Sequence, residues 1–256
     1  MPLAGQRSLL FPPLPSTDGL KAHMKGLSGI VRLWMLQEAA GAATAVDETG
    51  GSNGTLNGCA AGLVGAPQLS RHKAYSFDGI NDTIEIAADA TRNRSAITCV
   101  ALVNPVAGAT TQTIFYEETN GGAGTAPRFR LVMTGAELLS VGLSPTSAEI
   151  LVTLASPFPL TIGSWQLVAG EIDVANDTLR LWRSGSIWAQ ATNGGWTATA
   201  TEDLEGADGP VIGASTNTAA ARQLFWFGQI GMVAVFSRLL SASEHAAIAK
   251  KAGIRG

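Results

Sequence analysis

Cysteine, histidine and clusters of basic residues are scarce in this chain, and each scarcity excludes a class of site or partner. The 256 residues include 2 cysteines and 3 histidines, which are too few and too widely spaced for a zinc site or a dense disulfide framework. Cys59 and Cys99 are interpreted as small buried residues, with a single bridge between them left open. Lys and Arg form no block and the net charge is −3. We therefore expect neither a nucleic-acid partner nor an anionic membrane.

Long hydrophobic runs are also missing. No apolar stretch approaches the roughly 20 residues of a membrane-spanning helix. Near the start, Arg7 is followed by a few apolar residues before Pro12, Pro13 and Pro15 interrupt them, which does not fit a secretory signal peptide. Charged residues make up 14% of the chain and hydrophobic residues 46%, a balance typical of a folded globular protein. The pattern predicts folding in a reducing cytoplasm.

The first 26 residues differ in composition from the rest. Their prolines are incompatible with a helix interior or a central strand, so residues 1–26 are predicted to form an extended Pro-rich arm before a single domain at residues 27–256. Such an arm would dock on its own domain or on a neighbouring subunit. The candidate docking residues are Leu9, Leu10, Phe11 and Leu14.

From residue 30 onward, short apolar or alternating segments are separated by turns rich in Gly, Asn and Pro. The strand candidates include IVRLWML, KAYSFDG, TIEI, AITCVALVNP, WQLVAGEIDV, TLRLWRSGSIWAQA and FWFGQIGMVAVFS. Alternation with a period of two predicts half-buried strands. One segment, LSASEHAAIAKKAG, predicts a helix capped by Ser241 or Ser243. The expected fold is an all-β, antiparallel two-sheet β-sandwich of the jelly-roll type with a short C-terminal helix.

Several segments, in this order, resemble the laminin-G-like, concanavalin A-like jelly-roll family. YSFDGINDTIEI is similar to the family signature Phe-Asp-Gly-x-x-Asp followed by an apolar strand. GSWQLVAGEIDVANDTLRLWRSGS resembles its Trp-centred strand and hairpin, and FWFGQIGMVAVFSRLLSASE its closing strand. The resemblance covers about residues 30–249 and implies a jelly roll used for adhesion or carbohydrate contact.

The resemblance also implies a question about calcium, which members of this fold often hold at the sandwich edge. A hard cation needs six to eight oxygen ligands. Where the family commonly has an acidic residue in Gly-x-Ile-Asp, this chain has Gly231, so no cofactor is expected. Asp78, Asp82 and Asp47 are the remaining candidates for a weak calcium site, against the simpler interpretation of a hydrogen-bonded turn around Gly79.

Glucanases of the same fold carry a Glu-x-Asp-x-Glu strand, and here the nearest run is Glu171-Ile172-Asp173-Val174-Ala175. Ala175 stands in place of the third carboxylate, so these charges are interpreted as solvated and no enzymatic activity is expected. A glycoside hydrolase is the least favoured alternative. His72, between Arg71 and Lys73, is predicted to lie on the surface.

The tryptophans divide into core and surface candidates. Trp34, Trp165 and Trp182 lie in apolar strand patterns and are expected in the core. For Phe225-Trp226-Phe227, which places aromatics on both faces of a strand, a protein cover is favoured over a sugar. The candidates for glycan or partner contact are Trp188, Trp196, Phe225, Trp226 and Phe227.

Two functional hypotheses follow from these observations. The first is a non-catalytic virion structural or surface adhesion protein, a bacteriophage decoration, fibre or spike component. It would reach the virion surface after cytoplasmic assembly and contact other virion subunits, form a homo-oligomer, and bind a cell-surface glycan. The alternative is a soluble carbohydrate-binding module.

Overall fold

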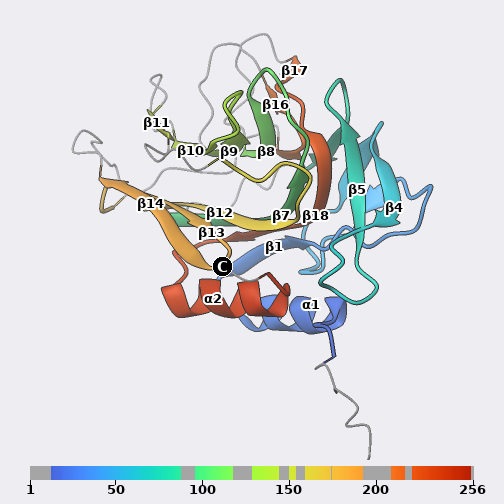
Figure 1. Ribbon diagram of the computed structural model, residues 1–256, viewed down its shortest axis with the longest axis horizontal. Coiled ribbons are helices and arrows are strands. Elements are labelled where there is room, and N and C mark those ends of the chain that lie inside the picture. The colour runs from blue at the N-terminus through green and yellow to red at the C-terminus, as the bar shows by residue number, and fades with distance from the viewer. Residues whose placement is uncertain are drawn as a thin grey trace, which may run out of the picture.

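The computed structural model describes residues 13–87, 96–117, 129–143, 150–153, 159–173, 175–192, 209–216 and 221–254. They form two antiparallel sheets stacked face to face, and two helices cover the outer side of one sheet (Figure 1). The all-β sandwich with a short C-terminal helix is therefore confirmed. Among the described residues, no helix has the length and apolar character needed to cross a membrane.

The first sheet has eight strands and lies between the second sheet and the helices (Figure 1). Its order is β14 (Ser186–Thr192), β13 (Thr178–Arg183), β12 (Gln166–Asp173), β7 (Ala96–Pro105), β18 (Phe227–Phe236), β5 (Lys73–Asp78) and β4 (Ala60–Val64), with β1 (Ile30–Trp34) also paired to β18. The long strands β7, β12 and β18 are buried along most of their length, because both of their faces are covered.

The second sheet also has eight strands. In sheet order they are β11 (Ile150–Thr153), β10 (Leu139–Leu143), β9 (Phe129–Met133), β8 (Gln112–Glu117), β15 (Pro210–Ile212), β6 (Thr83–Ile86), β3 (Gly54–Asn57) and β2 (Thr44–Ala45). A small hairpin, β16 (Ser215–Thr216) with β17 (Arg222–Gln223), completes the described strands.

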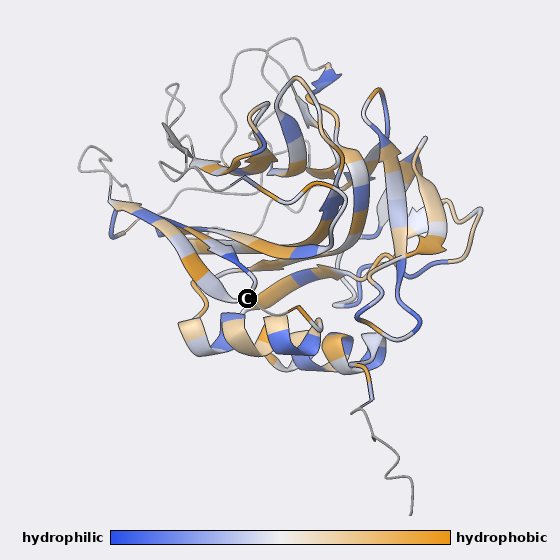
Figure 2. Cartoon of the chain, in the orientation of Figure 1, coloured by the Kyte–Doolittle hydropathy of each residue, from blue (hydrophilic) through white to orange (hydrophobic). Residues whose placement is uncertain are grey.

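Two hydrophobic layers hold the fold together, and β7 contributes to both. Cys99, Ala101 and Val103 point into the core between the sheets, whereas Val100 and Leu102 point toward the helices. This alternation follows from the period of two in a strand, and Figure 2 shows hydrophobic colour both on the strands of the sheets and on the helices packed against them. The position of a residue along β7 therefore determines which of the two hydrophobic layers its side chain joins.

Helix α1 (Thr17–Gly26) corrects the prediction of an extended arm over residues 1–26, which is wrong for residues 17–26. Ser16 caps this helix by accepting a hydrogen bond from the Gly19 amide. Leu20 and Met24, four positions apart, are buried against the first sheet. The first 12 residues, which include Leu9, Leu10 and Phe11, lie outside the described residues, and Leu14 is 60% exposed.

Helix α2 (Ala242–Lys251) confirms the predicted C-terminal helix and selects Ser241 as its cap. Ser241 and Glu244 form a capping box, in which each side chain accepts a hydrogen bond from the other residue's backbone N–H. Arg238 binds the Glu244 carboxylate at 2.6 Å. The hydrogen bond from Arg238 lowers the pKa of Glu244 to about 2. This ion pair therefore ties the segment after β18 to the first turn of α2.

The two cysteines are buried and unpaired, as the interpretation of small buried residues predicts. Burial, with a further contribution from Asp82, raises the pKa of the Cys59 thiol to about 12. Burial also raises the pKa of Cys99 well above its ordinary value. Both side chains are therefore held as neutral thiols.

Candidate functional site

The FDGIND signature forms a tight turn between β5 and β6. The Asp78 carboxylate accepts hydrogen bonds from the backbone amides of Ile80 (2.8 Å) and Asn81 (3.3 Å), and Gly79 takes a φ of 78°. Asp82 accepts a hydrogen bond from the Asp78 amide at 2.8 Å. Both carboxylates thus stabilise the turn, as the simpler interpretation predicts.

This turn packs against Phe227, the first residue of β18. Phe227 pairs with Asp78 in the register of β5 and β18, and its Cβ lies 3.0 Å from the point where a Cβ on Gly79 would stand. The Val106 amide donates to the Phe227 carbonyl at 2.9 Å. Ile80, Val106 and Phe227 are 70%, 36% and 40% exposed. We call these three residues the apolar rim.

Amide side chains lie beside the apolar rim. Gln112 accepts from the Phe227 amide at 2.9 Å and donates to the Val106 carbonyl at 3.3 Å. Asn104 donates to Gln229 at 3.4 Å, while its own side-chain oxygen is buried without a hydrogen-bond partner. Gln112 thus fixes the backbone beneath the exposed Phe227 side chain, and an aromatic side chain presented in this way is suited to stacking on a sugar ring.

The remaining aromatic candidates have different positions. Trp226 is 0% exposed and belongs to the core between the sheets, so its assignment as a contact residue is wrong. Phe225 is half-buried. Trp188 on β14 is half-buried, with the Arg183 guanidinium 5.2 Å from its ring centre, and Trp196 lies outside the described residues.

The tryptophans expected in the core follow the prediction in part. Trp34 and Trp182 are 0% and 6% exposed. Trp165 is half-buried and packs against the helix-side layer.

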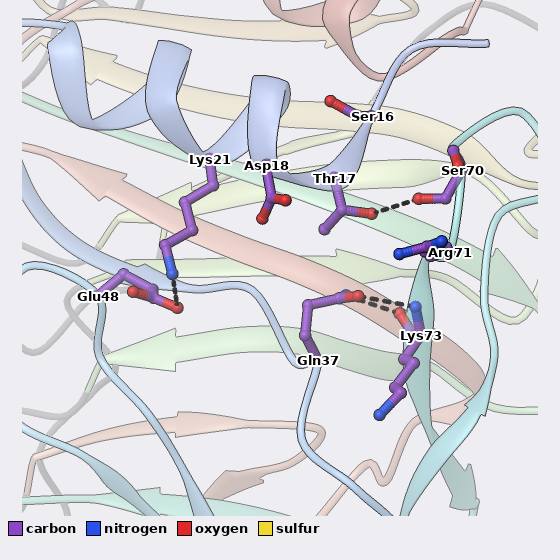
Figure 3. Close-up of a pocket in the computed structure, with 9 residues that line it drawn as sticks. All are labelled: Ser16, Thr17, Asp18, Lys21, Gln37, Glu48, Ser70, Arg71 and Lys73. Carbon is purple, nitrogen blue, oxygen red and sulfur yellow. Dashed lines mark hydrogen bonds and ion pairs between the residues drawn. The ribbon is translucent and has the colours of Figure 1, made fainter.

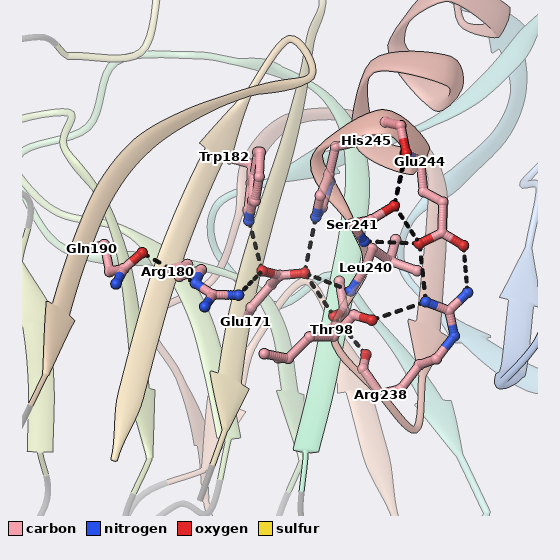
Figure 4. Close-up of polar contacts among 12 residues, drawn as sticks. Thr98, Glu171, Arg180, Trp182, Gln190, Arg238, Leu240, Ser241, Glu244 and His245 are labelled. Atoms are coloured by element: carbon pink, nitrogen blue, oxygen red, sulfur yellow. Dashed lines mark hydrogen bonds and ion pairs between the residues drawn. The ribbon is translucent and has the colours of Figure 1, made fainter. Parts of the chain in front are cut away.

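Glu171 is the centre of a buried polar network that joins β12 to helix α2 (Figure 4). It is 0% exposed, so the interpretation of a solvated charge is wrong. Its carboxylate accepts from Thr98 (3.0 Å), the Leu240 amide (2.9 Å) and Trp182 (2.7 Å), and lies 2.9 Å from His245 Nε2. The Trp182 and His245 rings stack with centroids 4.0 Å apart.

The environment of Glu171 contains opposing effects on its pKa. Burial raises this pKa, but the hydrogen bonds from His245, the Leu240 amide and Trp182 outweigh burial and hold it below its ordinary value. Asp173, the next carboxylate on this strand face, accepts from the Asn176 amide at 3.2 Å in the following turn. These two carboxylates therefore do not form the exposed pair of a retaining glycosidase. The absence of enzymatic activity stays a prediction.

His72 is 5% exposed, which corrects its prediction as a surface residue. Its Nδ1 accepts from the Ala66 amide at 2.8 Å, so Nε2 carries the proton and donates to the Gly231 carbonyl at 3.2 Å. Burial lowers the pKa of His72 to about 4. A Cβ on residue 231 would stand 2.3 Å from His72 Cε1, so the ring occupies the space that an acidic side chain would need at Gly231.

The candidate calcium ligands do not converge. Asp47 accepts hydrogen bonds from the amides of Leu33 (3.0 Å) and Thr49 (2.9 Å). Within the ranges that the structure describes, no three acidic, histidine or cysteine side chains form a group that could hold a metal ion. Asp78 and Asp82 share one turn, and in the described part of the chain they do not form a three-ligand group with Asp47.

A polar pocket lies where α1 meets the start of β5 (Figure 3). Its volume is ≈ 440 Å³. All of the residues that line it are polar or charged: Ser16, Thr17, Asp18, Lys21, Gln37, Glu48, Ser70, Arg71 and Lys73. Sequence reasoning missed this pocket because its walls come from four separate segments of the chain.

Several solved structures share this fold. Domain 4 of the Geobacillus stearothermophilus arabinanase AbnA, in complex with arabinotriose, is 15% identical, with 86% of this chain and 98% of that one covered and a TM-score of 0.58. The Ruminococcus gnavus IT-sialidase CBM40 bound to α2,3-sialyllactose is 17% identical, with coverage of 65% and 95% and a TM-score of 0.50.

A larger protein also contains a similar part. The leech intramolecular trans-sialidase is 16% identical, with 71% of this chain covered and a TM-score of 0.50. This chain spans 28% of the length of that enzyme. At these identities the likeness shows the fold alone, and no curated protein matches the chain.

A family profile settles the relationship that the fold indicates. The profile of the concanavalin A-like lectin/glucanases superfamily matches residues 78–244, more than half of the chain. The match begins at the FDGIND turn and ends in helix α2. The chain therefore belongs to the concanavalin A-like lectin/glucanases superfamily.

Proposed function

We propose that this chain is a non-catalytic carbohydrate-binding module that contacts its glycan at the apolar rim. The observation that carries the proposal is Phe227, which is 40% exposed and whose backbone is fixed by Gln112 and by pairing with β5. An aromatic side chain whose backbone is already fixed loses little further conformational entropy when it stacks on a sugar. The glycan complexes of the CBM40 and AbnA domains, which share the fold, support the same reading.

Phe227→Ala should weaken glycan binding about tenfold, equivalent to about 1.4 kcal/mol, because it removes the stacking surface while leaving the backbone hydrogen bonds in place. The glycan would be chosen from an array probed with the full chain, and its affinity measured by calorimetry.

Ile187→Ala is the matched control, since Ile187 is a 50% exposed apolar residue on β14 and is not part of the rim. Trp188→Ala tests the other aromatic candidate. If Trp188→Ala abolishes binding and Phe227→Ala does not, the site lies on β14 and the rim is excluded. An array without any bound glycan would contradict the function itself.

A second candidate is a surface protein of a larger assembly such as a virion, and the groove beside residues 13–15 favours it. This groove of ≈ 680 Å³ includes Leu14, Ala246, Ala249 and Ile254 in its wall. It lies next to the point where Leu9, Leu10 and Phe11 join the described chain. An assembly partner would cover the exposed side chains of Leu14 and Ala246.

Deleting residues 1–12 should leave the melting temperature nearly unchanged, because Ser16 and helix α1 remain. The same deletion should abolish self-association or particle attachment, measured by light scattering coupled to size exclusion and by mass spectrometry of particles. Unchanged association after removal of residues 1–12 would contradict the arm hypothesis.

A further inference from the structure

The polar pocket and the apolar rim lie at opposite ends of β5. Lys73, which lines the pocket, is the first residue of this strand, and Asp78, which pairs with Phe227, is its last. At about 3.4 Å per residue, their Cα atoms are roughly 17 Å apart. A ligand in the pocket would therefore occupy a site separate from the proposed glycan contact.

Backbone contacts hold the pocket wall in place. The Ser70 amide donates to the Pro15 carbonyl at 2.9 Å, and Thr17 Oγ1 donates to the Ser70 carbonyl at 3.1 Å. On the other side of Arg71, the Gln37 side chain binds both the amide (2.8 Å) and the carbonyl (2.9 Å) of Lys73. The segment that carries Arg71 and Lys73 is thus ordered before any ligand arrives, which lowers the entropy cost of binding.

The charges in the pocket are not all neutralised by one another. Lys21 and Glu48 form an ion pair at 2.6 Å. In contrast, the side chains of Asp18, Arg71 and Lys73 make no hydrogen bond or ion pair within the described part of the chain. Figure 3 shows Arg71 and Lys73 on the β5 side of the pocket and Asp18 beside Lys21 on the α1 side.

This distribution of charge selects one chemical class of ligand. Two unpaired cations attract an anionic group, and an arginine guanidinium matches the geometry of a carboxylate. Asp18 and Glu48 accept hydrogen bonds from hydroxyl groups but would repel a compact polyanion such as phosphate. The volume of ≈ 440 Å³ falls within the ~300–1,000 Å³ of small-molecule sites.

We propose that the polar pocket binds a carboxylated sugar, with Arg71 and Lys73 on the carboxylate and Asp18 on the ring hydroxyls. This goes beyond binding at the apolar rim and does not depend on it. An acidic monosaccharide of the hexuronic type would satisfy both charge signs at once.

The test is calorimetric titration of the full chain with glucuronic acid, glucose and inorganic phosphate. Glucuronic acid should bind, and added salt should weaken its binding. The double variant Arg71→Ala/Lys73→Ala should bind it at least tenfold more weakly. Lys25→Ala, which removes an exposed cation of α1 outside the pocket, should bind it as the native chain does.

A variant of the apolar rim distinguishes glucuronic acid binding in the polar pocket from glycan binding at the rim. Phe227→Ala should leave glucuronic acid binding unchanged, and a loss there would assign the acidic sugar to the rim instead. Equal binding of glucose, or tighter binding of phosphate, would overturn the carboxylated-sugar assignment. Equal binding by the native chain and the Arg71→Ala/Lys73→Ala variant would show that the polar pocket is not the binding site.

Discussion

Replacing Glu171 with alanine should destabilise the fold by about 3–5 kcal/mol, because a buried carboxylate is removed from partners that remain buried. The Leu240 amide, Trp182 Nε1 and Thr98 Oγ1 would each lose their acceptor, and His245 would lose its buried counterpart. A loss of this size is a large share of the ~5–15 kcal/mol that stabilises a typical domain. Denaturant unfolding measures the change.

Asp173→Asn is the matched control, since it alters the next carboxylate on the same strand face. Asp173 is only half-buried, so this change should cost less than about 1 kcal/mol. Similar losses in the two variants would contradict the network as the source of stability.

The difference in unfolding free energy between the native chain and Glu171→Gln should depend on pH. The pKa of Glu171 is lower in the folded chain than the ordinary value of 4.5. Its stabilising contribution is thus complete above that ordinary value and is lost as the pH falls through the folded pKa. The free-energy difference between the native chain and Glu171→Gln should shrink over this acidic range.

Gly231→Ala should destabilise the fold by about 1–3 kcal/mol, the usual cost of overpacking a core. The added Cβ would stand 2.3 Å from His72 Cε1 and 3.2 Å from Trp165 Cζ3. The His72 ring cannot move away freely, because both of its nitrogens are bound to the backbone. Thermal and denaturant unfolding would measure the loss.

A double-mutant cycle with His72→Ala identifies the clash as the cause. In the His72→Ala background, Gly231→Ala should cost much less, giving a coupling of about 1–3 kcal/mol. Gly26→Ala is the control for a glycine with free space, since a Cβ there meets nothing within 4 Å. An equal cost of Gly231→Ala in both backgrounds would contradict the steric explanation.

Much of the sandwich could be predicted from the sequence because strand periodicity is local. KAYSFDG and AITCVALVNP became β5 and β7, and the cap signal at Ser241 or Ser243 marked α2. Helix α1 was missed because the prolines before it outweighed the Ser16-Thr17-Asp18 cap signal. Its short apolar pair, Leu20 and Met24, has meaning only once the first sheet is there to cover it.

The site was less predictable because burial depends on partners remote in sequence. His72, between Arg71 and Lys73, has the local pattern of an exposed residue, yet its partner Gly231 is 159 positions away. Glu171 and His245 are 74 positions apart. The exposure of Phe227 and the burial of Trp226 could have been separated by strand alternation, whereas the polar pocket required the folded chain.

The helices also mark the side of the fold on which the two ends of the described chain lie. Pro13, Leu14 and Pro15 share one groove with Ile254, so the two ends of the described fold meet on the side of the helices (Figure 1). Tethers joined to either end would leave from a single face. Such tethers would leave the outer face of the second sheet uncovered.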